Sequence, residues 1–80
     1  MSLDWKPRIT LNPAVLAGKP TIRGLRISVE HVLRALSEGV PAEELLADYP
    51  DLEADDLHAC QAYAADLIAS ERVYPIRVGA

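Results

Sequence analysis

The sequence is poor in aromatic residues, and this bounds the core that it can build. Of its 80 residues one is Trp, three are Tyr and none is Phe, so the core must consist mainly of Leu, Val, Ile and Ala. Such a core is thin, and small domains often gain the missing burial by dimerising or by docking on a partner. We therefore expect a homodimer, a partner-bound protein, or both.

A single cysteine and the absence of long apolar runs indicate the cellular compartment in which we expect the protein. Cys60 has no second cysteine to pair with, so an internal disulfide is excluded, and its place in a predicted helix favours a small buried apolar residue. No apolar run is long enough to cross a membrane, and the N-terminus lacks the apolar core of a signal peptide. These absences favour a cytoplasmic protein.

Catalytic and metal-binding patterns are also lacking. His31 and His58 fall in different predicted helices, and neither has a matching ligand pair. Cys60 has no evident activating base, and no glycine-rich phosphate loop follows a buried strand. The acidic residues that cluster along the chain do not follow calcium-loop spacing; they are Asp48, Asp51, Glu53, Asp55 and Asp56. The sequence predicts neither an enzyme nor a metal or cofactor site.

Charge is distributed unevenly around a net value of −4. Residues 1–37 carry six cations and two acids, a net charge of +4, whereas residues 38–80 carry two cations and ten acids, a net charge of −8. A net negative charge argues against indiscriminate binding of nucleic acid. The asymmetry would orient the chain on an anion or on a charged partner, and ordinary solvated surface is the alternative.

Periodicity predicts short strands followed by three helices. Residues 8–11 alternate polar and apolar side chains and predict a strand, residues 13–24 predict mostly loop, and residues 25–27 predict a second short strand. Ser28 is suited to cap a first helix that Gly39 ends. A second helix is expected from about Pro41 until Pro50, and a third over 54–70.

These elements predict one mainly α domain over 1–80. We expect a small three-helix bundle of the helix-turn-helix type, homeodomain-like or winged-helix-like, with short N- and C-terminal β-strands. It comprises an N-terminal strand and basic arm (8–27), a three-helix core (28–70) and a C-terminal extended tail (71–80). The third helix begins with Glu53, Asp55 and Asp56, which phosphate would repel, so it is a poor recognition helix.

The basic arm is the strongest candidate for binding an anion. It runs from Gly18 to Ile27 and contains two glycines, one proline and three cations. If DNA is bound, the candidate contacts are Lys19, Arg23, Arg26 and Arg34. In an extended segment Arg23 and Arg26 would project from opposite faces. In the alternative interpretation both arginines are structural and pair with helix carboxylates to hold the arm on the bundle.

The ordered residues of this arm resemble the hallmark of the domain of unknown function 433 family. Gly18-Lys19-Pro20-Thr21-Ile22-Arg23-Gly24-Leu25-Arg26-Ile27-Ser28-Val29 is similar to the pattern Gly-Lys-Pro-x-Ile-x-Gly-Thr-Arg-Ile-x-Val, and the likeness covers about residues 8–76. The resemblance implies a helix-turn-helix fold, often a dimer, and a VapB-type antitoxin encoded beside a PIN-like ribonuclease toxin. Two residues depart from the pattern: Leu25 replaces a usual Thr, and Glu53 replaces a common capping Thr or Ser.

The C-terminal tail is the second candidate site, because antitoxins commonly bind their toxin with an extended terminal segment. The candidate toxin-binding residues are Arg72, Val73, Tyr74, Ile76 and Arg77. The apolar residues would fill grooves, and an arginine would pair with the metal-binding acids of a PIN-like nuclease. Alternatively the tail adds a strand to the protein's own sheet or across a dimer.

Three functions follow from these residues and this resemblance. The first is an antitoxin-like component of a type II toxin-antitoxin system that inhibits a PIN-like ribonuclease and autoregulates its operon by binding operator DNA. The second is a stand-alone helix-turn-helix transcriptional regulator. The third is a non-enzymatic adaptor that docks on an acidic protein surface.

Overall fold

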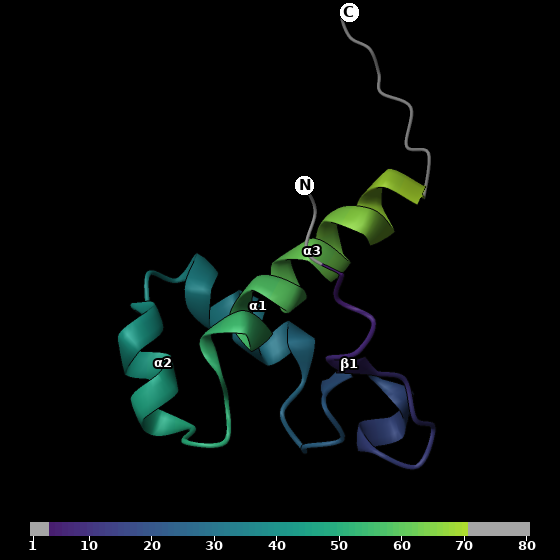
Figure 1. The fold of residues 1–80 in the computed structure, drawn as a ribbon, viewed down its shortest axis with the longest axis horizontal. Helices are drawn as coiled ribbons and strands as arrows, with labels where there is room; N and C mark the ends of the chain where they lie inside the picture. The colour runs from purple at the N-terminus through teal and green to yellow at the C-terminus, as the bar shows by residue number, and fades with distance from the viewer. Residues whose placement is uncertain (1–3, 71–80) are drawn as a thin grey trace, which may run out of the picture.

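Within residues 4–70 the protein is mainly helical, with three α-helices and a two-stranded antiparallel sheet (Figure 1). The computed structural model describes residues 4–70. In chain order the elements are β1 (Ile9–Thr10), the 3₁₀ turn η1 (Leu16–Gly18), β2 (Thr21–Ile22), α1 (Val29–Ser37), α2 (Ala42–Asp48) and α3 (Ala54–Ser70). The predicted helical fold class is thus confirmed. The predicted C-terminal strand falls in 71–80, outside the described residues.

The second strand lies earlier than the sequence predicts. We expected it at 25–27, but β2 is Thr21–Ile22, inside the stretch predicted as loop, and pairs with β1 so that Ile9 faces Ile22. Arg23 and Gly24 have positive φ angles of 47° and 76° and reverse the chain directly after β2. Because the segment turns there, Arg23 and Arg26 do not share one extended stretch, so the expectation that this segment is extended was wrong.

Local capping explains where α1 begins and ends. The Ser28 hydroxyl accepts a hydrogen bond from the backbone N–H of His31 at 2.9 Å, as the sequence predicts for an N-cap. At the other end Gly39 has a φ of +90°, and the N–H of Val40 donates back to the carbonyl of Ala35. That bond satisfies one of the last free carbonyls of the helix, so α1 stops where the glycine was expected to stop it.

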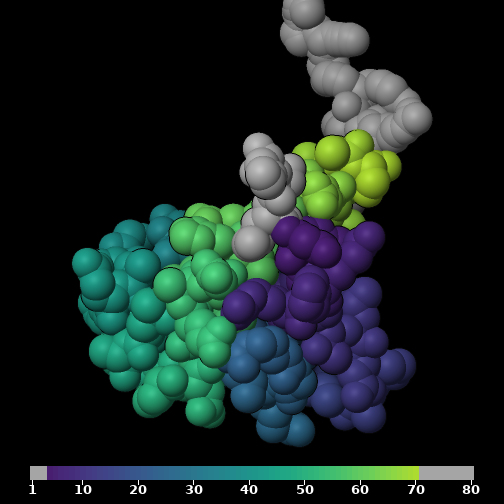
Figure 2. All heavy atoms as spheres, viewed as in Figure 1, coloured from purple at the N-terminus to yellow at the C-terminus, as the bar shows by residue number. Residues whose placement is uncertain are grey.

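The core lies between the sheet and the three helices. Its buried apolar residues are Ile9, Ile22, Val29, Val32, Leu45, Leu52, Leu57, Ala59 and Cys60. It contains no aromatic residue, as the composition predicts, and the first half of α3 supplies three of its members. Residues 65–70 of α3 are all exposed, and of the described chain the N-terminal segment lies against this end of the helix (Figure 2).

The N-terminal segment is fastened to α3 by Trp5. Its indole N–H donates a 2.7 Å hydrogen bond to the Asp66 carboxylate, and its ring meets Tyr63 edge-on with centroids 4.8 Å apart. Both contacts are to the second half of α3, so the start of the described chain covers one side of that helix. The side of α3 that faces α1 is not covered by this N-terminal segment.

Candidate interaction site

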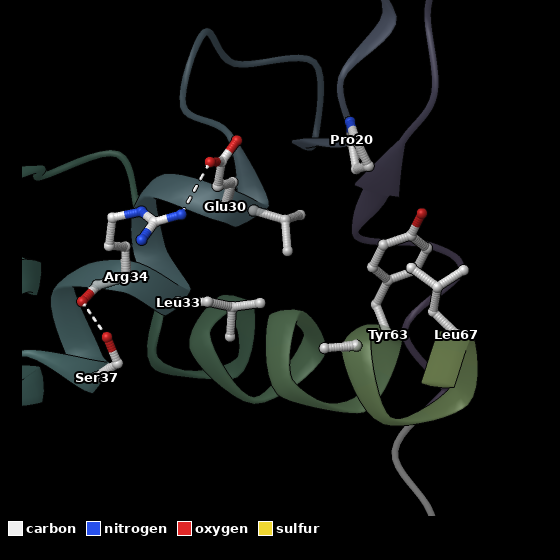
Figure 3. A pocket seen from close by; sticks show the side chains of 9 residues that line it. Pro20, Glu30, Leu33, Arg34, Ser37, Tyr63 and Leu67 are labelled. Atoms are coloured by element: carbon white, nitrogen blue, oxygen red, sulfur yellow. Dashed lines mark hydrogen bonds and ion pairs between the residues drawn. The ribbon is translucent and has the colours of Figure 1, made fainter. Parts of the chain in front are cut away.

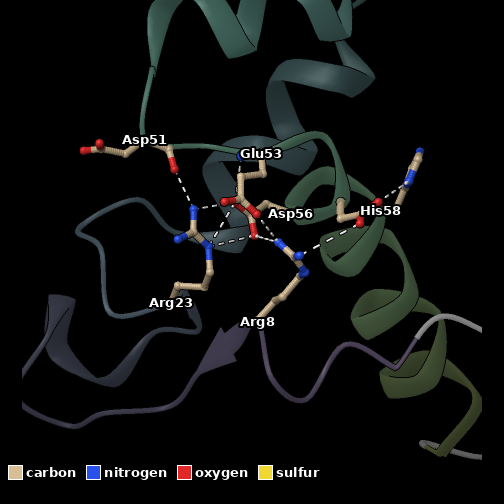
Figure 4. Close-up of polar contacts among 7 residues, drawn as sticks. Arg8, Arg23, Asp51, Glu53, Asp56 and His58 are labelled. Atoms are coloured by element: carbon tan, nitrogen blue, oxygen red, sulfur yellow. Dashed lines mark hydrogen bonds and ion pairs between the residues drawn. The ribbon is translucent and has the colours of Figure 1, made fainter.

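A buried carboxylate with two arginines lies where the basic arm meets α3 (Figure 4). Asp56 is fully buried in the first turn of α3. Arg23 reaches its two carboxylate oxygens at 2.8–3.2 Å, and Arg8 reaches one at 2.9 Å. The backbone N–H of Glu53 supplies a further bond at 2.8 Å, as the third residue of a helix receives in a capping box. Every polar atom of this carboxylate is therefore matched.

The cluster keeps Asp56 ionised. Burial by itself raises the pKa of the Asp56 carboxyl, but the bonds from Arg23, from the Glu53 N–H and from Arg8 together outweigh burial and lower that pKa below its usual value. The pKa of the Arg8 guanidinium is raised by its hydrogen bond to the Glu53 side chain and then by that to Asp56, and the pKa of Arg23 is raised by its hydrogen bonds to Asp56. The Glu53 carboxylate, which accepts a 2.8 Å hydrogen bond from Arg8, balances the second arginine. The four side chains form a compact, charge-balanced clamp between the arm, the residue before β1 and α3.

Of the four candidate DNA contacts, Arg23 is the one that this clamp occupies. Its guanidinium also donates to the backbone carbonyl of Asp51, and its side chain is 31% exposed. The alternative that the sequence left open, an arginine pairing with helix carboxylates, describes Arg23 correctly. Sequence reasoning missed the partners Arg8 and Asp56, although the three-residue spacing of Glu53 and Asp56 at a helix start was a usable signal.

Lys19 and Arg34 converge on a single acid at the surface. Their side chains approach Glu30 at 3.1 and 3.2 Å respectively, and all three are more than half exposed. The hydrogen bond from Lys19, then that from Arg34, lowers the pKa of the Glu30 carboxyl. The trio forms an exposed strip along α1 with a net charge of +1.

Arg26, the fourth candidate, lies elsewhere. It is exposed and borders a hollow of about 260 Å³ together with Ser28, His31 and Tyr49. The His31 Nε2 and the Tyr49 hydroxyl are hydrogen-bonded at 2.9 Å, which fixes both rings beside the start of α1. Within residues 4–70 no ion pair is formed by Arg26, in contrast to the other three candidates.

An apolar groove separates α1 from the second half of α3 (Figure 3). Its volume is about 460 Å³, and we call it the α1–α3 groove. It is lined by Pro20, Val29, Leu33, Tyr63, Ala64 and Leu67, with Glu30, Arg34 and Ser37 at its edge. The basic arm thus borders the groove through Pro20, and its Lys19 is paired with Glu30, one of the charged residues that line the groove.

The open end of α3 continues the apolar surface of this groove. Leu67 is 47% exposed and Ile68 is 63% exposed. The sequence predicts both on the apolar face of the third helix together with Leu57 and Cys60, but the fold buries only the latter two. The reason is length: α3 has 17 residues, and the shorter α1 and the sheet cover only its first part.

The remaining predictions concern the C-terminal tail, metal binding and membrane-spanning helices. The candidate toxin-binding residues Arg72, Val73, Tyr74, Ile76 and Arg77 lie outside the described residues. In the described part of the chain, no group of three or more His, Cys, Asp or Glu side chains is placed to hold a metal ion. None of the helices between residues 4 and 70 is long and apolar enough to span a membrane.

Comparisons with known proteins agree on the family. A curated relative, "Uncharacterized protein y4eO" of Sinorhizobium fredii, is 32% identical over 56 residues, which is 70% of this chain but 25% of that protein. A crystal structure of a DUF433 member protein from Anabaena variabilis matches with a TM-score of 0.74 and 35% identity, over 81% of this chain and 64% of that one. This chain therefore spans only part of the length of either relative. The family model "Protein of unknown function (DUF433)" matches residues 9–64, and the chain belongs to the DUF433 family.

Proposed function

We propose that the chain is an antitoxin-like, non-enzymatic component of a type II toxin-antitoxin system that binds and inhibits a PIN-like ribonuclease. The observation that carries this proposal is the exposed end of α3, residues 65–70, which includes exposed Leu67 and Ile68 and a single charge, Asp66. A solvated helix surface normally carries several charges, whereas interface cores are depleted of them. The proposal includes self-association of the chain and a cytoplasmic location.

The charge arrangement supports a protein partner ahead of nucleic acid. Arg23 is committed to Asp56, and Lys19 and Arg34 share Glu30. Three of the four predicted phosphate contacts thus already form ion pairs within the chain. Releasing Arg23 for DNA would deprive the buried Asp56 carboxylate of a partner, which is costly, whereas the exposed pairs of Lys19 and Arg34 with Glu30 contribute little. The apolar surface beside these residues, in contrast, could contact a protein partner without breaking any of these ion pairs.

Inhibition would come from the tail that follows α3. Residues 71–80 begin where the helix stands away from the core, and they contain Arg72 and Arg77. An arginine that enters a carboxylate-lined nuclease site forms charge-assisted hydrogen bonds with the acids and competes with the divalent metal by charge. The apolar tail residues would supply contact area.

The test uses the nuclease encoded beside this chain, if one is present, as the partner. We expect the full chain to co-purify with that nuclease and to stop its cleavage of RNA, and we expect a chain ending at Ser70 to fold normally but to lose both properties. The double variant Arg72→Ala with Arg77→Ala should lose inhibition more than binding. A matched control is Arg26→Ala, an exposed arginine that borders the hollow beside the start of α1. Full inhibition by the truncated chain would refute the tail's role, and a bound nuclease that keeps full activity would favour the adaptor.

DNA binding is the second candidate function, and Arg26 favours it. Arg26 is exposed beside the start of α1, and Ser28 and His31 line the same hollow. Helix N-termini attract phosphate, and an unpaired guanidinium adds to that attraction. Binding to the upstream DNA would weaken steeply with salt, and Arg26→Ala would weaken it at every salt concentration. Affinity that is insensitive to salt and to Arg26→Ala would exclude this function.

A further inference from the structure

The α1–α3 groove and the exposed end of α3 are complementary surfaces on one chain. The groove is an apolar trough between two helices (Figure 3). The end of α3 is an apolar ridge formed by the exposed Leu67 and Ile68. A trough of this kind receives a helix through apolar residues spaced along one face. Leu67 belongs to both surfaces, so the ridge of one copy would lie next to its own trough.

We propose that a second copy of this chain occupies the groove, with the two α3 helices packed antiparallel about a two-fold axis. In such an interface the ridge of each copy packs into the groove of the other, so the same apolar contact forms twice. This inference deepens the proposed function and rests on it only for self-association. It identifies the surface by which the copies meet.

The charges around the groove favour this occupant. Glu30 and Arg34 line the groove and Lys19 is paired with Glu30, a net charge of +1 for the three. The exposed residues 65–70 of α3 carry only the negative Asp66, which accepts a hydrogen bond from Trp5. The end of a helix also bears partial negative charge, and the last turn of α3 contains no basic residue to balance it. Antiparallel packing would bring the end of the partner's α3 toward this positive edge.

The same composition disfavours nucleic acid as the occupant. Residues 59–70 contain no Lys or Arg, and phosphate binding needs cations. An unrelated apolar partner would fill the groove but would leave the ridge of this chain without a matching trough. A second copy covers both, which is why it is the preferred occupant.

Sedimentation equilibrium on the purified full-length chain is the first test. We expect the mass of a dimer, and we expect Leu67→Glu to raise the dimer dissociation constant at least about tenfold, since it places an unpaired charge in the apolar contact. Ala47→Glu is the matched control, because Ala47 is exposed on α2, away from the groove. A monomeric wild-type chain, or equal weakening by both variants, would overturn the proposal.

Cross-linking between two different variants tests the geometry. Ser37→Cys at the groove edge and Ser70→Cys at the end of α3 would be mixed and treated with a short bis-maleimide reagent. Cys60 is buried, which keeps it silent in both. We expect a linked Ser37→Cys–Ser70→Cys pair, and none when Ala47→Cys replaces Ser37→Cys. A dimer that links the control pair equally, or links neither, would show that the copies meet elsewhere.

The two proposals fail in different ways. A monomer that still inhibits the nuclease would refute the groove as a self-contact while leaving the antitoxin-like function intact. A Leu67-dependent dimer that neither binds nor inhibits the nuclease would support the groove as the self-contact and refute the antitoxin-like function.

Discussion

The guanidinium of Arg23 meets both carboxylate oxygens of Asp56, at 2.8–3.2 Å, although the two residues are 33 positions apart. One belongs to the turn after β2 and the other to the first turn of α3, so this contact ties the hallmark arm to the helix that carries the exposed apolar end. Because Asp56 is fully buried, its charge has no access to water and depends on its protein partners.

We expect Arg23→Ala and Arg26→Ala to affect stability very differently, although both remove an arginine from the same motif. Loss of Arg23 leaves Asp56 short of one partner, and we expect it to lower the free energy of unfolding by about 2 kcal/mol. Arg26 is exposed, so its loss should change stability by no more than about 0.5 kcal/mol. Urea denaturation followed by circular dichroism measures both, and similar losses would contradict the assignment.

Stability should fall on acidification because of Asp56. The pKa of this carboxyl is lower in the folded protein than in the unfolded chain, where it is about 3.9. As the pH falls, the unfolded chain takes up the proton first, so protonation favours unfolding. The stabilisation is complete above about pH 5 and is lost as the pH falls through the lower, folded value.

Urea midpoints measured from pH 7 to pH 2 would check this pH dependence. The Asp56→Asn variant has no proton to gain at this site, so its stability should start lower and fall less steeply below pH 5. Parallel curves for the two proteins would show that another group is responsible.

Residues whose roles are local were predictable from the sequence. Ser28 and Gly39 set the ends of α1 as expected, because a cap depends on only a few neighbouring backbone groups. The range of α3 was likewise predicted as 54–70, since its apolar period is long. Each of these predictions depends only on residues within one helix or directly next to it.

Relationships between distant segments were not predictable in the same way. The position of β2 depends on the reversal at Arg23 and Gly24, and nothing in the local pattern distinguishes that turn from an extended arm. The pairing of Arg8 with Asp56 spans 48 positions, and only the assembled fold brings them together. The exposure of Leu67 and Ile68 likewise follows from how far α1 and the sheet reach along α3.

Cys60 should be inert in the folded protein. Burial, and then the nearby negative charge of Asp56, raises the pKa of its thiol to about 12. The reactive thiolate is therefore scarce at pH 8, and the side chain is fully enclosed. We expect negligible modification by 5,5′-dithiobis(2-nitrobenzoate) in buffer and complete modification in denaturant. Rapid reaction of the native protein would mean that the first half of α3 opens readily.

The turn after β2 offers a test of backbone strain separated from packing. Gly24 has a φ of +76°, and a Cβ added there would meet no atom within 4 Å, so a substitution changes the backbone preference and little else. We expect Gly24→Ala to lower the free energy of unfolding by about 1 kcal/mol, because L-residues disfavour this conformation. Gly24→Asn should cost less, since asparagine adopts left-handed angles more readily than alanine. Thermal denaturation of the three proteins would rank them, and an alanine variant as stable as the parent would show that the arm reverses without the left-handed turn on which the Arg23–Asp56 contact depends.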